Sequence, residues 1–284
     1  MCLRFPNKDA ARVKDIGSNL RRCGATEGLL APSLRYDLMK LPNHHNHTGN
    51  HNFSYCAEPD LYLEWYEEHQ ELWSQVAITD HAFAIAFPKD IAWGFRWHTD
   101  PSYFEEYREY RLDKMKQYLD MLSRLDRRKF IPGIELEVTS RGELTVDEEY
   151  IPHFEIILGA VHYLPGEDEE EIIASFTEQV TALMEHPIDI LAHPFRILER
   201  KISDIPPWLI DFVVTRATEA NVALELNSHK ISPYDETLVA RTLKQGGKVA
   251  IGTDTHARYE FLDASYHLDL CRKLGIGPQD IFIK

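Results

Sequence analysis

The sequence has few cysteines and no long apolar run. Its four cysteines lie far apart, include no C-x-x-C pair and are too few to form a disulfide framework in 284 residues. No window approaches about eighteen uncharged apolar residues, and basic residues interrupt the N-terminal stretch where a signal peptide would be apolar. These absences argue against a secreted or membrane-spanning protein, and we expect a cytoplasmic one with no membrane partner.

Basic charge is also scarce. Lys and Arg number 31 against 46 Asp and Glu, which gives a net charge of -15. Proteins that follow the phosphate backbone usually carry basic patches, so long nucleic acid is not expected as a partner. Carboxylates that face bound divalent cations would add to the same acidic excess.

Short apolar runs of strand length alternate with longer segments of helical period from about residue 40 onward. This alternation is typical of βα units around a parallel sheet, and a chain of this length fits one α/β barrel. The helices have end signals: Asp100-Pro101 before residues 103–125, and Ser232-Pro233 before a helix that Gly246-Gly247 closes. The expected strands are residues 38–45, 75–79, 130–138, 154–161, 188–192, 222–226, 248–252 and 281–283.

Two segments stand apart from this alternation. Residues 1–37 precede the first strand and form an expected N-terminal arm of unknown role, so that 38–284 make a single domain. Residues 82–101 are rich in Phe and Trp and too long for a tight connection. This aromatic insertion is either a lid or a loop packed on the barrel.

Acids and histidines recur where the expected strands end. A lone histidine would more often be a surface or core residue, but the repetition argues against that interpretation. In α/β barrels the carboxyl ends of the strands form the active-site face, so these side chains would converge. The seven places are His45-Asn46-His47, Asp80-His81, Glu135, His162, His193, Glu225-Leu226-Asn227 and Asp254-Thr255-His256.

The spacing within these clusters favours metal binding. In His45-Asn46-His47 the two imidazoles lie on one face of a strand, because side chains alternate with period two, and Asp254 and His256 share that spacing. Mixed imidazole and carboxylate ligands suit Zn, Mn or Fe, and a carboxylate such as Glu135 can bridge two ions. The sequence therefore predicts a centre with more than one metal ion.

In order and spacing these motifs resemble the PHP family, the polymerase and histidinol phosphatase superfamily. The family's opening D-x-H-x-H-T is met by residues 43–48, its T-D-H by 79–81 and its P-G-x-E by 132–135. Its G-S-V-H is met by residues 159–162, its A-H-P by 192–194, its E-x-N by 225–227 and its G-S-D-x-H by 252–256. The resemblance thus spans about residues 40 to 260.

That resemblance implies a distorted (β/α)7 TIM-like barrel with two to three divalent metal ions, which hydrolyses phosphoesters by a metal-activated water. Glu135 would bridge one ion held by His45, His47 and Asp254 to a second held by His162 and His193. His81 and His256 would serve a third. Asp254 and His256 are also candidates for passing a proton to the leaving group.

The sequence departs from the family pattern at several positions. Asn43 stands where the family has Asp, and Ala160 and Thr253 stand where it has Ser. The usual third-site ligand shortly after His-x-His has no clear match, and His51 and Cys56 are both candidates for it.

The leading functional hypothesis is a small-molecule phosphatase that resembles histidinol phosphatase. Arg196 and Arg258 follow strand-end motifs and are candidates to bind the substrate's phosphate, although each could equally pair with surface acids.

Three alternatives remain. A phosphodiesterase or exonuclease would act on short nucleotides, and a non-catalytic metal-binding regulatory module would hydrolyse nothing. Hydrolysis of C–N bonds, as in amidohydrolases, also begins with His-x-His, but such enzymes commonly bridge their metals with a modified Lys, and this chain offers Glu135 there.

Overall fold

The described chain is built on six parallel strands that follow one another in sequence order. The computed structural model describes residues 40–48 and 59–284, and Leu41–Lys284 form one compact unit. Each strand pairs in parallel with the next, so the predicted α/β class with a parallel sheet is confirmed. The strands are β1 (Val76–Ile78), β2 (Phe130–Leu136), β3 (Ile156–Gly159), β4 (Ile190–Leu191), β5 (Ala223–Asn227) and β6 (Val249–Gly252).

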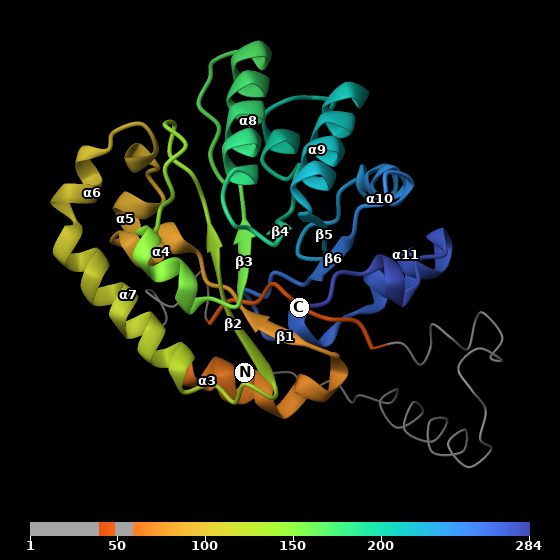
Figure 1. The fold of residues 1–284 in the computed structure, drawn as a ribbon, viewed down its shortest axis with the longest axis horizontal. Coiled ribbons are helices and arrows are strands. Elements are labelled where there is room, and N and C mark those ends of the chain that lie inside the picture. Colours follow the sequence, from red (N-terminus) through yellow and green to blue (C-terminus); the bar gives the residue numbers. More distant parts are fainter. Residues whose placement is uncertain (1–39, 49–58) are drawn as a thin grey trace, which may run out of the picture. The chain divides into compact units, whose positions relative to one another are not determined.

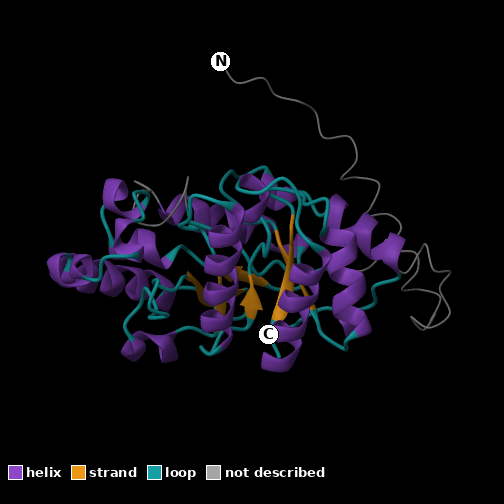
Figure 2. Ribbon diagram, turned by 90° about the horizontal axis from the view of Figure 1, so that it is seen from above, coloured by secondary structure: helices purple, strands orange, loops and turns teal. Residues whose placement is uncertain are grey.

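The helices lie outside the strands. Figure 1 shows α8 to α11 beside the strands β3 to β6, and in Figure 2 helices flank the strands on both sides. In the part of the chain that the structure describes, no helix is long and apolar enough to cross a membrane. The helices are α3 (Pro59–His69), α4 (Ala82–Ala86), α5 (Lys89–Ala92), α6 (Ser102–Glu106), α7 (Arg108–Ser123), α8 (Glu169–Met184), α9 (Pro207–Ala220), α10 (Asp235–Lys244) and α11 (Ser265–Leu274).

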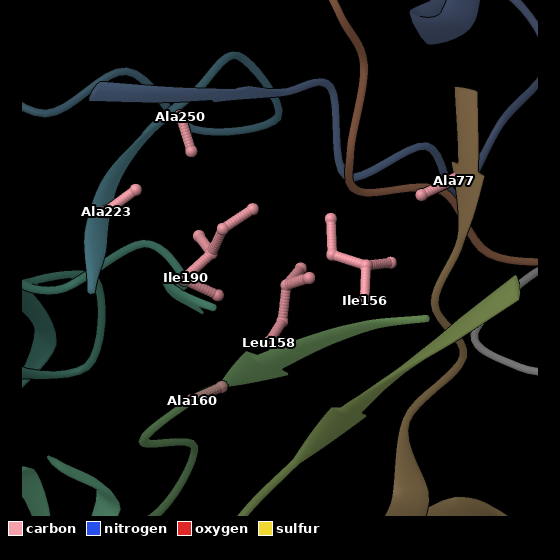
Figure 3. Packing of buried hydrophobic residues seen from close by; sticks show 8 residues of the cluster. Ala77, Ile156, Leu158, Ala160, Ile190, Ala223 and Ala250 are labelled. Carbon is pink, nitrogen blue, oxygen red and sulfur yellow. The ribbon is translucent and has the colours of Figure 1, made fainter. Parts of the chain in front are cut away.

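The sheet is curled around a core of small and aliphatic side chains. Ile156 and Leu158 alternate along β3 and point to the same side as Ile190 of β4 (Figure 3). Ala77 of β1 and Ala250 of β6 belong to the same buried cluster although their strands lie at opposite ends of the strand order. The first and last strands therefore face a shared interior.

Residues 43–46 join the two ends of the strand order. On the β1 side, Ala77 N–H donates to the Asn43 carbonyl at 2.9 Å. On the β6 side, His44 N–H donates to the Ile251 carbonyl at 2.9 Å, and Asp254 N–H donates to the His45 carbonyl at 2.8 Å. The His-x-His motif is thus held between β1 and the end of β6.

Three predicted elements differ from the structure. The strand predicted at Ile281 to Ile283 is wrong: only one isolated bridge links Ile281 to Val249, with the Phe282 N–H donating to the Val249 carbonyl. The Lys284 N–H donates to the Gln75 side chain instead of a strand. The helix predicted over residues 103–125 is two helices, α6 and α7, which meet at Tyr107. The strand predicted over 38–45 forms only isolated bridges from residue 40 on; its start, like the arm of residues 1–37, lies outside the described residues.

The aromatic insertion packs against itself and the barrel. All five residues of α4 are buried, and the Phe83 and Phe87 rings each stack on Trp97 at 5.8 Å between centroids. The Phe83 ring also lies 5.5 Å from that of His162. This packing agrees with the expectation of a packed loop, and it places aromatic side chains beside one of the strand-end histidines.

His267 of α11 gives the fold a sensitivity to acid. The side chain is fully buried, its Nε2 lies 3.2 Å from the Leu226 carbonyl, and burial lowers its pKa to about 4. Below pH 6.5, the ordinary pKa of histidine, His267 binds a proton in the unfolded chain but not in the folded chain. The free energy of unfolding therefore falls as the pH is lowered from 6.5 toward 4, by about 3 kcal/mol in all, and above about pH 6.5 this loss is absent.

We expect His267→Gln, which keeps a donor for that carbonyl, to flatten the dependence of the free energy of unfolding on pH between 6.5 and 4. Urea titrations at several pH values measure this, with the exposed His153→Gln as control. An equal slope in wild type and His267→Gln would contradict it.

Candidate metal centre

The strand-end histidines and acids converge at one end of the sheet. His81, Glu135, His193 and Asp254 come from four different strand ends, yet each lies within contact distance of another member of the cluster. The strands run in parallel, so their carboxyl ends meet at the same edge. The predicted convergence is therefore present in the structure, with most of its side chains fully buried.

Glu135 lies at the centre of the cluster. Its Oε2 is 2.6 Å from Nδ1 of His81 and 3.3 Å from Nε2 of His45. Its Oε1 is 3.0 Å from Nε2 of His193 and 3.5 Å from Nε2 of His162. One carboxylate thus reaches four imidazoles, as a group that bridges two ions would.

Asp254 organises the other side of the cluster. Its Oδ1 is 2.9 Å from Nε2 of His47 and 3.5 Å from Nε2 of His45, while Nδ1 of His256 lies 2.8 Å from the Asp254 carbonyl oxygen. Asp254 and His193 both have left-handed backbones, with φ of 49° and 30°. Non-glycine residues seldom adopt this conformation, and such strain is concentrated at functional sites.

The electrostatics keep Glu135 ionised. Burial alone would raise the pKa of Glu135, but His45 and His81 hold it well below its usual range. Burial likewise opposes the protonation of His45, but Glu225, Glu135 and Asp254 raise its pKa well above the ordinary value. The cluster thus favours positive charge between its carboxylates.

These residues fit divalent metal ions. Among the described residues, the buried atoms His45 Nε2 and Glu135 Oε2 lie 3.3 Å apart without a hydrogen bond of good geometry, although Oε2 is also 2.6 Å from His81 Nδ1. A metal ion between such a pair would satisfy both lone pairs. Five groups of three ligand atoms lie close enough to hold an ion: His47, His81 and His256; His45, Glu135 and His193; His45, His47 and Asp254; His81, Glu137 and His162; and His229, His256 and Glu260.

Glu137 is a candidate that the sequence analysis missed. Its Oε1 lies 2.9 Å from Nδ1 of His162, and burial together with Glu135 raises its pKa well above the usual range. Glu135 and Glu137 have the same i, i+2 spacing that pointed to His45 and His47, so the sequence signal was there.

His229 and Glu260 were also missed. Nδ1 of His229 lies 2.8 Å from Oε1 of Glu260, whose Oε2 accepts the backbone N–H groups of His256 and Ala257 at 2.7 Å each. Glu260 therefore fixes the loop that carries His256. His229 lies in the loop after β5, and Glu260 begins the short 3-10 helix Glu260–Leu262 after β6, where no periodic pattern marks them.

Acids behind the histidines orient them. Glu225 lies 2.8 Å from Nδ1 of His45, and its other oxygen accepts the His193 N–H at 2.7 Å. Asp80 accepts both the N–H and the hydroxyl of Thr48 and lies 3.8 Å from Nδ1 of His47. Carboxylates in this position commonly fix which imidazole nitrogen faces a metal.

The two predicted phosphate-binding arginines lie in different surroundings. Arg196 is largely buried and its guanidinium bonds to Asp254 and to the side chain of Asn227, so it reaches the cluster. Arg258 lies over the rings of Tyr62 and Trp65 of α3, at 5.3 and 5.7 Å from their centroids. His51 and Cys56, the predicted candidates for the third metal site, lie outside the described residues.

Two departures from the family pattern contact each other. Asn43 donates from Nδ2 to Thr253 Oγ1 at 2.8 Å and to Asn46 Oδ1 at 2.9 Å, and the Thr253 N–H donates to Asn43 Oδ1. The orientation of the Asn46 amide is fixed because its nitrogen donates to the carbonyls of Asn43 and Ala77. The surroundings of position 43 thus require a side chain that donates hydrogen bonds. The family's Asp, when ionised, would present an oxygen there instead.

We expect Asn43→Asp to destabilise this protein by about 1–3 kcal/mol near neutral pH, because a buried carboxylate would face two acceptors. Urea unfolding at pH 7 measures the loss, and Asn221→Asp, the same change at an exposed position, is the control. Unchanged stability in Asn43→Asp, despite this network, would show that the site accommodates the family's Asp.

Two sequence relatives have names that fit the phosphoester hydrolysis expected from the motifs. The DNA polymerase/3'-5' exonuclease PolX of Bacillus subtilis is 28% identical over 158 residues, which are 54% of this chain and 26% of that protein. A probable phosphatase of Clostridium acetobutylicum is 30% identical over 139 residues, which are 45% of this chain and 52% of that protein. The predicted resemblance to the PHP family is confirmed.

The chain spans at most about half the length of these two PHP-type relatives. No family model matches the sequence. Among solved structures, histidinol phosphate phosphatase from Lactococcus lactis subsp. lactis, complexed with zinc, L-histidinol and phosphate, aligns with a TM-score of 0.48 and 15% identity over 86% of this chain and 94% of that chain.

Proposed function

We propose that this protein is a metal-dependent phosphatase that hydrolyses small phosphomonoesters. The observation that carries the proposal is the buried cluster in which Glu135 reaches four histidines from different strand ends. We also propose that residues 43–46 count as the seventh strand of a distorted (β/α)7 barrel, since they hydrogen-bond to β1, to β6 and to the segment after β6.

The ligands proposed for two to three divalent ions are the eight metal-binding residues predicted from the sequence. Two of them, His162 and His193, are assigned to different ions than the resemblance implied. His193 shares a ligand group with His45 and Glu135, whereas His162 shares one with His81 and Glu137. We therefore add Glu137 to the set. The complete set is His45, His47, His81, Glu135, Glu137, His162, His193, Asp254 and His256.

The protein's own groups have distinct proposed roles. Bound divalent ions would activate water and neutralise the charge of the phosphate. Arg196, held beside Asp254, would orient a phosphate oxygen through its guanidinium, and Arg258 stays a second candidate. Asp254 and His256 stay candidates for passing a proton to the leaving group, a role that each could fill only where it does not bind a metal ion. Burial lowers the pKa of His256 to about 3, so its ring is neutral near pH 7 and would have to receive that proton first.

An exonuclease or phosphodiesterase is the second candidate, because one relative is named as a 3'-5' exonuclease. Turnover of p-nitrophenyl phosphate compared with bis(p-nitrophenyl) phosphate separates the two. We expect phosphate release from the monoester, together with at least two metal ions per chain by elemental analysis. Turnover of the diester alone would favour the second candidate, and metal-loaded protein that hydrolyses neither would favour a regulatory module.

A further inference from the structure

A small pocket opens beside the metal centre, and two cations of its lining have no ion-pair partner among the described residues. Its volume is about 180 Å³, and its lining includes His193 and Asn227 from the centre as well as Arg196, Arg200 and Lys230. Arg200 belongs to the turn Leu198–Arg200 after β4, and Lys230 to the loop after β5. Both loops follow strand carboxyl ends, the face on which α/β barrels bind substrates.

The two outer cations differ from Arg196. Arg196 is bonded to Asp254, whereas among the described residues neither Arg200 nor Lys230 has an ion-pair or hydrogen-bond partner for its side chain. All three cations line the same small pocket, so an anion bound there would face Arg200 and Lys230 together.

The carboxylates of the pocket are already engaged elsewhere. Glu199 accepts from the Ser232 hydroxyl, and Glu225 from the His193 N–H with its other oxygen against His45. Asp235 accepts from the Tyr266 hydroxyl and the Ser232 N–H. Among the described residues, none of these carboxylates forms an ion pair with Arg200 or Lys230.

We propose that Arg200 and Lys230 bind a second anionic group of the substrate, so that the preferred substrates are small phosphomonoesters that also carry a carboxylate or a further phosphate. This rests on the proposed phosphatase function. The volume of the pocket suits a group of that size, and ionised pairs of this kind contribute strong, oriented hydrogen bonds. An uncharged hydroxymethyl group would leave both cations without a partner.

The test compares 3-phosphoglycerate with glycerol 3-phosphate, which differ by a carboxylate in place of a hydroxymethyl group. We expect wild-type kcat/KM to favour 3-phosphoglycerate by about tenfold or more, since one charged hydrogen bond is worth about that much. In Arg200→Gln/Lys230→Gln the ratio should fall to near one. Lys201→Gln, which removes a neighbouring exposed cation outside the pocket, should keep the wild-type ratio.

A wild-type ratio near one, or a ratio that the double variant retains, would overturn the proposal. Calorimetric titration of the metal-loaded protein with the same two compounds keeps the test independent of turnover. If neither these two compounds nor p-nitrophenyl phosphate is hydrolysed, but 3-phosphoglycerate binds more tightly and only through Arg200 and Lys230, the phosphatase function fails and the anion site stands. If both are hydrolysed and bound equally well, the anion site alone fails.

Discussion

Glu135→Gln is expected to abolish measurable phosphatase activity and to lower the metal content. The amide keeps the size of the side chain but removes the charge that faces His45, His81, His162 and His193. Metal ions stabilise phosphoryl transfer by several kcal/mol, and about 1.4 kcal/mol is tenfold, so the expected loss is on the order of 1,000-fold in kcat. Steady-state assays with elemental analysis of the same preparations measure both effects.

The matched control is Glu219→Gln, which changes an exposed carboxylate of α9 that pairs with Arg216. It should keep wild-type activity and metal content. If Glu135→Gln lost activity but bound the full complement of metal, Glu135 would act on the substrate rather than as a bridging ligand. Full activity in Glu135→Gln would contradict the proposed centre.

The convergence of the strand-end side chains could be predicted because its sequence signals are local and repeated. Each strand-end motif places its side chain within a residue or two of a strand terminus, and a parallel sheet brings those termini together whatever the intervening helices do. For His45 and His47, the alternation of side chains along a strand is enough to predict that both imidazoles lie on one face. For this reason the predicted cluster appears even though the strands are shorter than predicted.

The parts that were missed depend on contacts between distant segments. Glu260 contacts His229 and the backbone of His256 from a short 3-10 helix whose sequence shows no periodic pattern of apolar residues. The break at Tyr107 divides a segment whose pattern indicated one helix. At this break the Tyr107 ring packs edge-on against Phe87 of the aromatic insertion. Tertiary packing overrides local propensity in such places, and a single sequence does not reveal it.

Gly252→Ala is expected to damage the centre without changing any ligand. A Cβ at this position would lie 1.9 Å from Glu225 Oε1 and 2.7 Å from the His45 Cβ, so the carboxylate would have to leave His45. Loss of such an orienting partner typically costs about 10–100-fold in metal affinity or activity, and overpacking costs about 1–3 kcal/mol of stability. Metal titration and urea unfolding measure the two effects separately.

Gly159→Ala separates the orienting effect from simple crowding. Its added methyl would meet Ile188 and Leu183, on the helix side of β3, with a closest approach of 2.7 Å. We expect it to lose stability but to bind metal as the wild type does. If both variants lost metal in proportion to their stability, Glu225 would have no orienting role beyond packing. A selective loss in Gly252→Ala would assign to Glu225 the task of presenting His45 Nε2 to the metal.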